Sequence, residues 1–439
     1  MTATARQFRA DATRKAADLH HRAVVQKAIA TYDAAVSKGK SRYADWQNAR
    51  AHAAAIKWET INHLDSYLEQ FERNVIETGG HVFWAECAED ARRHILDLAR
   101  RHHVQKVVKS KSMTTEEIHL NEALEEAGIY AVETDLGEYI CQLRREPPYH
   151  IITPVMHLTK ADIARTFEEK LGTSPTASAE ELTMIARERL RREFLSADMG
   201  ITGANFAVAE TGQIAITENE GNARLCFSLP RLHVAVVGIE KLLPRVDDLA
   251  MFWPLLATSG TGQALTCYNS LVGGGEDFHV VLLDNGRTRL LADVEQRDAL
   301  HCIRCGACLN ACPVFKNIGG HAYGTTYQGP IGSVITPHLR DAEEWSHLPY
   351  ASSLCGACTD VCPVKIELHH HLLHNRRNAV QRKFDHPLQR FAFRLWFWVM
   401  QSPVRYTIAG KLARPFLRRW AVPPPHSFRA WWRKHGSRA

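Results

Sequence analysis

Seven of the eleven cysteines in this 439-residue sequence fall in two short motifs. The first motif, CIRCGACLNACP at residues 302–313, has the spacing C-x2-C-x2-C-x3-C-P. In two-cluster ferredoxins the first three thiolates of such a motif bind one cubane iron–sulfur cluster and the fourth binds the other. The second motif, SSLCGACTDVCP at residues 352–363, repeats the pattern with Ser352 in place of Cys302. The two motifs therefore predict two iron–sulfur clusters that share seven cysteine ligands.

The exchange of the fourth cysteine between motifs assigns a ligand set to each cluster. The first cluster would be bound by Cys302, Cys305, Cys308 and Cys362. The second would be bound by Cys312, Cys355 and Cys358, with Ser352 at its fourth corner. Zinc is the alternative, because C-x2-C pairs often bind Zn²⁺. Four cysteines in one short turn suit tetrahedral zinc poorly, and the repeated Cys-Pro ending favours iron–sulfur clusters.

Three arrangements are possible at the corner of the second cluster that lies next to Ser352. A non-cysteine ligand such as Ser352 or water could bind the fourth iron, or that iron could be lost to give a [3Fe–4S] cluster. The sequence leaves these two open. A distant cysteine is less favoured, because isolated buried cysteines usually fill cores. The candidates for that role are Cys87, Cys141, Cys226 and Cys267.

Composition indicates a soluble globular protein of two or three domains, with 45% hydrophobic and 23% charged residues. The N-terminal sequence has no apolar run typical of a secretory signal, and no stretch is long enough to span a membrane. We therefore expect a cytoplasmic protein with reduced cysteines.

The net charge of +6 conceals a strongly basic C-terminal region. Residues 376–439 contain fifteen Lys or Arg against one acidic residue, and half of the ten tryptophans. These tryptophans are Trp396, Trp398, Trp420, Trp431 and Trp432. Such an arm predicts docking to an acidic protein surface, which we favour, or peripheral association with an anionic membrane. No nucleic acid is expected.

The pattern along the chain predicts four regions. Residues 1–75 are Ala-rich with helical spacing and should form long helices. Residues 76–295 alternate strand-like runs (106–110, 128–136, 206–217, 233–239 and 278–286) with helical stretches, the rhythm of an α/β domain. Within them, LLDNGRTRLL predicts an Asn-Gly turn between strands. Residues 296–375 form the helical two-cluster module, and residues 376–439 the basic helical arm, interrupted by VPPPH at 422–426.

Four further features are candidates for function. In VVKSKSMTTEEI, Thr114 and Glu117 predict a capping box, which would place Lys109 and Lys111 at an anion-binding helix N-terminus or in a solvated loop. The Gly-rich run 257–275 matches no nucleotide-binding fingerprint. One glutamate, Glu210, is a weak candidate nucleophile. HHHLLH at 369–374 is more typical of packed or exposed histidines than of a metal site.

Longer stretches of the chain resemble the lactate utilization protein B family, the iron–sulfur subunit of the bacterial L-lactate utilization system. The resemblance rests on CIRCGACLNACPVF, GPIGSVITP and LPYASSLCGACTDVCPVKI, and upstream on VVKSKSMTTEEIHLNEAL, ADMGITGANFAVAETGQIAITENEGNARL and DNGRTRLL. It covers residues from about 20 to 375, and the family also has Ser at the position of Ser352.

The resemblance implies an α/β domain of the sugar-isomerase and CoA-transferase type, followed by a helical two-cluster ferredoxin-like module. It also implies a role beside two partner subunits in oxidising L-lactate to pyruvate. Two hypotheses follow. In the first, which we favour, the chain is an electron-transfer subunit of an oxidoreductase complex. In the second, the α/β domain is itself catalytic and the clusters conduct its electrons. The sequence shows no dinucleotide fingerprint or acid–base pair that supports the second.

Overall fold

The computed structural model describes residues 2–174, 176, 178–384, 387–420 and 428–435. It divides into a compact unit, residues 2–379, and a C-terminal arm that begins at Val380. The predicted break at VPPPH (422–426) lies outside the described residues.

The compact unit begins with four helices, as expected. They are α1 (Ala3–Ala17), α2 (Leu19–Lys40), α3 (Trp46–Asn62) and α4 (Leu64–Glu77). The first three start at side-chain caps, because the oxygens of Thr2, Asp18 and Asp45 accept backbone N–H groups of the first helical turn. These caps fix where one helix ends and the next begins.

A six-stranded parallel sheet forms the centre of the unit, in the order β1-β10-β7-β4-β2-β3. Its strands are β1 (His81–Ala85), β2 (Lys106–Lys109), β3 (Tyr130–Glu133), β4 (Met199–Thr202), β7 (Leu232–Gly238) and β10 (Phe278–Leu283). The central strand β7 is buried along its whole length, as parallel strands covered on both faces are. The mixed α/β class predicted from the sequence is confirmed.

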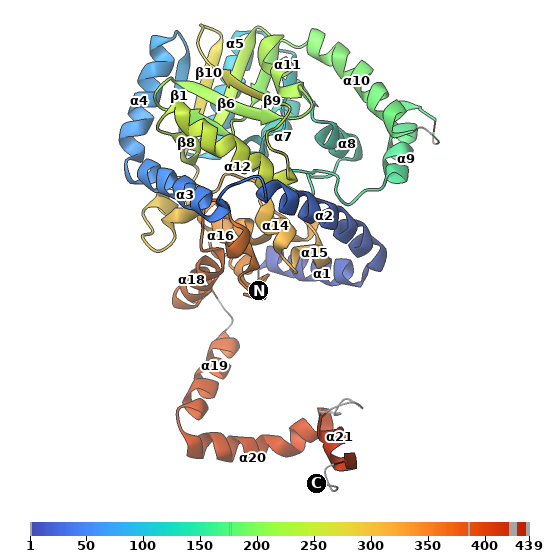
Figure 1. Ribbon diagram of the computed structural model, residues 1–439, viewed down its shortest axis with the longest axis vertical. Coiled ribbons are helices and arrows are strands. Elements are labelled where there is room, and N and C mark those ends of the chain that lie inside the picture. The colour runs from blue at the N-terminus through green and yellow to red at the C-terminus, as the bar shows by residue number, and fades with distance from the viewer. Residues whose placement is uncertain (1, 175, 177, 385–386, 421–427, 436–439) are drawn as a thin grey trace. The chain divides into compact units, whose positions relative to one another are not determined.

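Two different layers cover the faces of this sheet (Figure 1). On one face α5 (Ala88–Arg101) and α7 (Leu120–Glu126) pack their apolar residues against the strands. On the other face lie α4 and a second, four-stranded sheet of order β8-β5-β6-β9. Its strands are β5 (Phe206–Val208), β6 (Gln213–Glu218), β8 (Leu242–Leu243) and β9 (Tyr268–Val272).

The remaining elements of the α/β region connect these layers. They are α6 (Met113–Glu117), α8 (Leu136–Arg144), α9 (Lys160–Leu171), α10 (Ala179–Leu195), α11 (Asn222–Ser228), η1 (Ile239–Lys241), η2 (Val246–Asp248), α12 (Leu249–Thr261) and α13 (Arg287–Leu291). One expectation is wrong here. The Asn-Gly turn of LLDNGRTRLL joins β10 to helix α13, with positive φ at Asn285 and Gly286, and does not join two strands.

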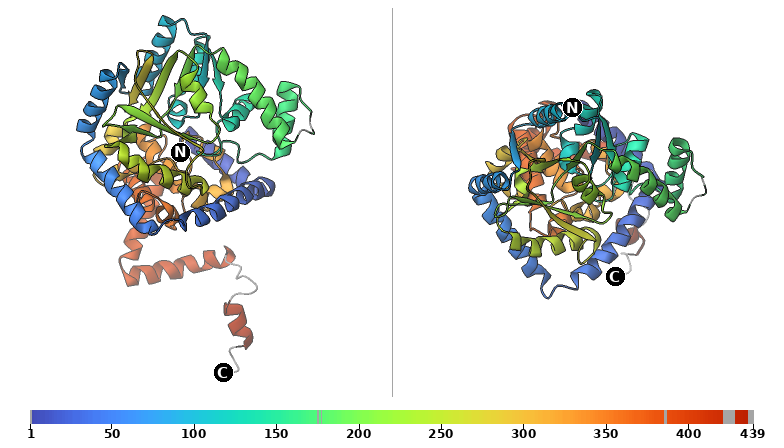
Figure 2. Two further views of the ribbon diagram at one scale, coloured as in Figure 1. Left: turned by 45° about the horizontal axis from the view of Figure 1, so that its top comes forward. Right: turned by 90° about the horizontal axis from the view of Figure 1, so that it is seen from above.

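The cysteine motifs lie in a segment of short helices. These are η3 (Arg297–His301), α14 (Ala307–Ala311), α15 (Phe315–Ile318), η4 (His321–Tyr323), α16 (Gly329–Leu339), η5 (Leu348–Tyr350), α17 (Ala357–Val361) and α18 (Leu368–Gln381). The N-terminal helices, blue in Figure 2, pack against this segment. Helices α1 and α2 contact α15, and α3 contacts η3. One hydrophobic core therefore contains Val25 and Ile29 of α2 together with the buried cysteines.

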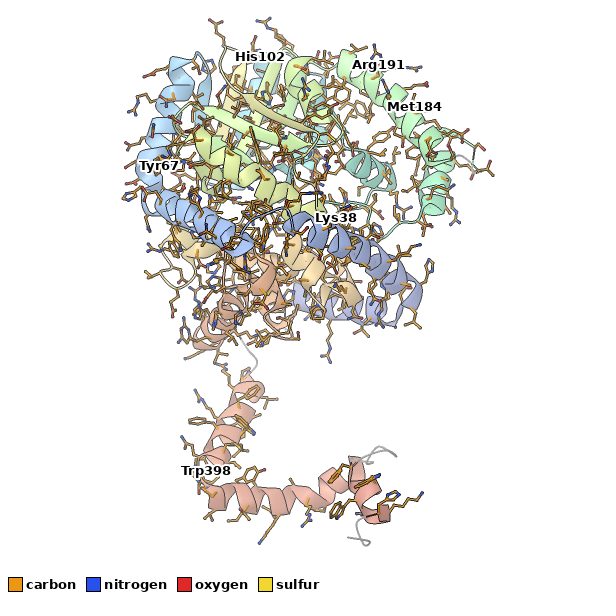
Figure 3. The ribbon with its side chains drawn as sticks, in the orientation of Figure 1. Lys38, Tyr67, His102, Met184, Arg191 and Trp398 are labelled. Carbon is orange, nitrogen blue, oxygen red and sulfur yellow. The ribbon has the colours of Figure 1, made fainter. Side chains whose placement is uncertain are left out.

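In its described residues the arm contains three helices, α19 (Pro387–Met400), α20 (Pro403–Trp420) and α21 (Phe428–His435). Most of the large apolar side chains of α19 are exposed, including Phe391, Trp396 and Trp398. The guanidinium of Arg405 lies 4.5 Å from the ring centroid of Trp398, which is labelled in Figure 3. Within the described residues, no helix combines the length and apolarity needed to cross a bilayer.

Candidate metal centre

The two cysteine motifs adopt the same backbone conformation. Arg304 and Leu354, each directly before a cysteine, have φ of 60° and 56°. Gly306 and Gly356 follow those cysteines with φ of 74° and 83°, a region that favours glycine. Each motif then continues into a five-residue helix, α14 or α17, and the two helices contact each other. The repeat recognised in the sequence is therefore also a repeat in three dimensions.

Each motif ends in the same way. After α14 and α17 the chain becomes extended at Cys312 and Cys362, with ψ of 119° and 118°. The prolines that follow, Pro313 and Pro363, cannot donate a helical hydrogen bond. The last cysteine of each motif is therefore directed away from its own helix.

Four of the cysteines line one small cavity. Cys302, Cys305 and Cys308 come from the first motif, and Cys362 from the second. The other lining residues are mainly apolar, such as Ile303 and Ile331. Burial raises the pKa of Cys305 and Cys308, and that of Cys362 to about 12. Thiols in this setting become thiolates when a metal replaces the proton.

The other three cysteines of the motifs form a second group nearer the surface. Cys312 and Cys358 are buried, whereas Cys355 is exposed. Burial and the neighbouring Cys312 raise the pKa of Cys358 to about 11. The backbone N–H of Ala357 and the hydroxyl of Ser353 lower the pKa of Cys355.

The surroundings of both groups suit iron–sulfur clusters. The backbone N–H of Ile366 donates to Sγ of Cys362 across 3.3 Å. Ala307 and Ala357, at equivalent positions in the two motifs, direct their N–H groups at Cys305 and Cys355. Hydrogen bonds to sulfur are one means by which a protein sets the potential of a cluster. The residues present therefore fit the predicted group.

Ser352, the residue in place of a cysteine, belongs to a local turn. Its Oγ accepts the backbone N–H of Leu354 at 3.1 Å, and its carbonyl accepts Nη2 of Arg376 at 3.1 Å. These hydrogen bonds hold the start of the second motif in place, and the hydroxyl oxygen keeps a further lone pair.

The four cysteines outside the motifs lie in the α/β region. Cys87, before α5, donates to Asp90, and Cys267, before β9, is exposed. Cys141 of α8 and Cys226 of α11 are buried. Burial raises the pKa of Cys226 to about 12 and also raises that of Cys141. Cys141 and Cys226 therefore behave as parts of the core.

Two cationic side chains of α3 lie near the first cysteine group, which is Cys302, Cys305, Cys308 and Cys362. On α3, Arg50 donates from Nε to the carbonyl of Cys362 at 2.8 Å. Lys57, 1% exposed, donates from Nζ to the carbonyls of Glu240 and Leu242 at 2.7 and 3.2 Å. Sequence reasoning missed both residues. The signal available was their spacing of seven, which places them on one face of the helix.

A buried ion-pair network joins the α/β region to the first motif. Arg287 donates both Nη atoms to Glu117, at 2.9 and 2.8 Å, and Nε to Glu240 at 2.5 Å. Arg304, between two cysteines of the first motif, reaches Glu240 at 3.4 Å. The hydroxyl of Tyr327 also donates to Glu117, at 2.6 Å. Through these contacts the sheet and the cysteine motifs share one electrostatic core.

The same network shows that the predicted capping box is wrong. Ser112 caps α6, because its Oγ accepts the N–H of Thr115, and Thr114 lies inside the helix. Glu117 is not a capping residue, since it pairs with Arg287. The predicted cap, Thr114, lies two residues beyond the observed cap, Ser112. The sequence does not show that Glu117 pairs with Arg287.

Lys109 is neither in a solvated loop nor at an anion site. Its ammonium is buried and lies 2.7 Å from Glu133 and 3.1 Å from Glu116. Glu138 completes this group, with both carboxylate oxygens buried and without a partner in the described structure. The three glutamates could hold a cation, and Lys109 already supplies one. Lys111 donates to the carbonyl of Ile152.

The other candidates have structural positions. Glu210 is exposed in the turn after β5 and accepts the N–H of Val246 at 2.9 Å. Within HHHLLH, His371 is buried against Asp298 at 2.8 Å and His370 is exposed on α18. Residues 257–275 form the end of α12, a loop and β9. None of these groups gathers metal ligands in the part of the chain described here.

Two family models match the chain. The LUD domain matches residues 68–283, which contain the parallel sheet. The 4Fe-4S dicluster domain matches residues 298–366, which contain both cysteine motifs. The second match supports the predicted iron–sulfur clusters and not the zinc alternative.

Similar proteins cover most of the chain. Lactate utilization protein B of Shouchella clausii is 46% identical over 90% of this chain and 86% of its own. The protein of the same name from Oceanobacillus iheyensis is 41% identical over 93% of each chain. The uncharacterized electron transport protein YkgF of Escherichia coli is 42% identical over 91% of this chain and 86% of its own. A crystal structure of a duf162 family protein from Deinococcus radiodurans is 16% identical, with a TM-score of 0.27 that is too low to identify a shared fold.

Proposed function

Because the chain belongs to the lactate utilization protein B family, we propose that it is the electron-transfer subunit of a complex that oxidises L-lactate to pyruvate. The observation that carries this proposal is the pair of cysteine motifs with one shared backbone conformation. A bound iron–sulfur cluster accepts and releases single electrons. The other lactate-utilization subunits would supply and remove those electrons.

The proposed ligands of the first cluster are Cys302, Cys305, Cys308 and Cys362, which line one cavity. The proposed ligands of the second, of type [4Fe–4S] or [3Fe–4S], are Cys312, Cys355 and Cys358. The exposure of Cys355 supports the second group as the place where a partner exchanges electrons, because electron transfer needs close approach. The first cysteine group, in which Cys305, Cys308 and Cys362 are buried, would then lie between the second group and the α/β domain.

Iron content and spectra test these assignments. Protein purified without oxygen should be brown and contain roughly seven to eight irons per chain. Cys305→Ala should remove the iron of the first cluster, and Cys355→Ala that of the second. Cys267→Ala removes an exposed cysteine outside the motifs and should leave the iron content unchanged. Stoichiometric zinc without visible absorbance would overturn the proposal.

The α/β domain is proposed to share the fold of sugar isomerases and CoA transferases. Its six-stranded parallel sheet, covered by helices on one face and a second sheet on the other, supports this. The alternative, in which this domain oxidises lactate itself, has a simple test. Purified protein mixed with L-lactate should not bleach its own cluster absorbance unless a partner subunit is added.

The arm is proposed to lie on the anionic cytoplasmic face of a membrane. Exposed apolar side chains surround most of α19, and Arg390 and Arg394 provide a narrow basic stripe. Aromatic residues next to arginines are typical of helices in the headgroup region. Charge alone favours docking to an acidic protein surface. The exposed apolar side chains of α19 support a membrane instead, because an acidic surface would leave them uncovered.

Vesicle binding of the full chain tests the arm. Binding to vesicles with phosphatidylglycerol should exceed binding to neutral vesicles and weaken as salt rises, since exposed charges are screened within about 10 Å at 0.1 M. Trp396→Glu with Phe397→Glu should abolish binding. Leu195→Glu with Val294→Glu, two exposed apolar residues of the compact unit, is the matched control. Retained vesicle binding in the arm variant, or capture of a partner subunit that only this variant loses, would contradict membrane docking.

A further inference from the structure

A second cavity, of about 280 Å³, lies beside the first cysteine group. Its walls come from the loops that follow β2 and β4, from the end of β6, and from α12. In a parallel sheet, the crevice beyond the carboxyl ends of the strands is the usual place for a small ligand. Arg304 and Tyr327 close the cavity on the side of the cysteine motifs.

One buried cation lines this cavity without a partner. Lys241, at the end of η1, is 7% exposed, and its ammonium makes no hydrogen bond or ion pair with the described part of the chain. Burial and the neighbouring guanidinium of Arg304 lower its pKa to about 8. Nη1 of Arg304 is likewise buried and unpaired. Lys111 also lines the cavity, but its ammonium donates to the carbonyl of Ile152, and Arg304 pairs with Glu240. Of these three cations, Lys241 is the one without a hydrogen bond or ion pair within the described residues.

The other lining residues limit the charge of a ligand. Asp135, Glu218 and Glu220 are carboxylic acids on the same cavity. They would repel a phosphate ester, which carries about two negative charges near neutral pH. Burial and Asp135 raise the pKa of Glu220 to about 7, so its carboxyl can exist in the protonated form at neutral pH. The lining therefore suits a single negative charge together with a hydroxyl or carbonyl group.

We propose that this cavity binds a small monocarboxylate, with Lys241 as the residue that pairs with its carboxylate. Ser110, Asn205 and Thr217 line the same cavity and offer hydrogen bonds to the polar remainder of such a molecule. The ligand would lie next to Arg304 and hence close to Cys302, so its charge would act on the first cluster. The inference rests on the cavity alone and does not require that electrons reach the clusters from a partner.

Titration calorimetry of the full chain with its clusters, in the absence of oxygen, tests the proposal. L-lactate, pyruvate and acetate are the carboxylate probes, and inorganic phosphate is the comparison. At least one carboxylate should bind saturably and more tightly than phosphate. Lys241→Met should weaken that binding by at least about tenfold, because it removes a buried charge partner. Lys241→Arg, which keeps the charge, should retain most of it.

Two controls accompany this measurement. Iron content and cluster spectra should be the same in Lys241→Met and the native protein, which shows that the variant folds. Lys170→Met, at an exposed lysine of α9, should bind like the native protein. A shift in the reduction potential of the first cluster on Lys241→Met, without saturable carboxylate binding to the native protein, would mean that Lys241 only balances the cluster charge. That result, or tighter binding of phosphate, would overturn the proposal.

Discussion

Arg50 of α3 donates from Nε to the backbone carbonyl of Cys362 across 2.8 Å, although the two residues are 312 positions apart. Its Nη2 also reaches the carbonyl of Thr359 at 3.3 Å. Helix α3, which is distant from the cysteine motifs in the sequence, thus holds Cys362 in place. Cys362 is the residue of the second motif that belongs to the first cysteine group. The position of Cys362 depends on a contact that no motif contains.

Replacing Arg50 should loosen the first cluster. Arg50→Met removes two hydrogen bonds from a charged donor to carbonyls that each keep one backbone N–H partner, and hydrogen bonds to charged groups contribute about 1.5–3 kcal/mol each. Iron release to a chelator should become several-fold faster for one cluster and stay unchanged for the other. Electron paramagnetic resonance after partial chelation identifies which cluster is lost. Arg73→Met, at an exposed arginine of α4, is the control, and equal release rates in both variants would contradict the role of Arg50.

Ser352→Cys should change the second cluster. A serine hydroxyl has a much higher pKa than a thiol and is a poor ligand unless iron forces its deprotonation. The native protein exposed to air should therefore lose one iron and show a three-iron signal at about g = 2, with roughly one spin per chain at most. Ser352→Cys should suppress this signal. Ser66→Cys, at an exposed serine of α4 outside the motifs, should not. Identical spectra of Ser352→Cys and native protein would point to another ligand at this corner.

Breaking the buried ion pair should destabilise the compact unit. Arg287→Met leaves Glu117 and Glu240 without their principal counter-charge, and loss of one partner of a buried pair costs about 3–5 kcal/mol. The midpoint of urea unfolding should fall accordingly. Adding Glu117→Gln to Arg287→Met should restore part of the loss, because fewer buried charges remain unpaired. A double variant no more stable than Arg287→Met would show that the two residues do not act as a pair.

Glu138→Gln should change how stability depends on pH. Burial and the nearby Glu133 raise the pKa of Glu138 well above 4.5. The folded protein therefore holds a proton that the unfolded chain releases, and native stability falls as pH rises from about 4.5 through the folded pKa. Gln carries no such proton. The variant should gain on the native protein by up to roughly 1.4 kcal/mol per pH unit in that range.

Unfolding midpoints between pH 5 and pH 8 measure this gain, with the pH values spaced by about one unit. Glu125→Gln, at an exposed position of α7, should follow the native protein throughout. A constant difference between Glu138→Gln and the native protein would mean that Glu138 is ionised in both states.

Prediction from the sequence was most accurate for features that neighbouring residues encode. The cysteine spacing predicted two equivalent motifs, and alternating apolar runs located most of the parallel strands, including β2 and β7. The strands at residues 81–85 and 199–202 were not predicted from the sequence. The Asn-Gly pair was misread because a left-handed turn can precede a helix as well as a strand.

The site depends on contacts that local patterns do not encode. Lys57 and Lys109 look like surface lysines in the sequence, and both are buried by partners distant in the chain. Lys241 follows a buried strand and gives no sign of the cavity that it lines. The charges of Lys57 and Lys241 become informative only when the fold brings Glu240 near them, and that of Lys109 only when Glu133 and Glu116 lie beside it.

The position of the N-terminal helices bears on the order of folding during synthesis. Helix α1 leaves the ribosome long before the cysteine motifs, yet it packs against α15 and η4, which are made about three hundred residues later, and Thr4 donates to the carbonyl of Glu344. Contacts so distant in sequence form slowly, because the chain must first close a long loop. The parallel sheet can therefore assemble while α1 still lacks its partners α15 and η4. Iron and sulfide would have access to the nascent cysteine motifs until α1 docks, so a helix made before both motifs takes its final place after them.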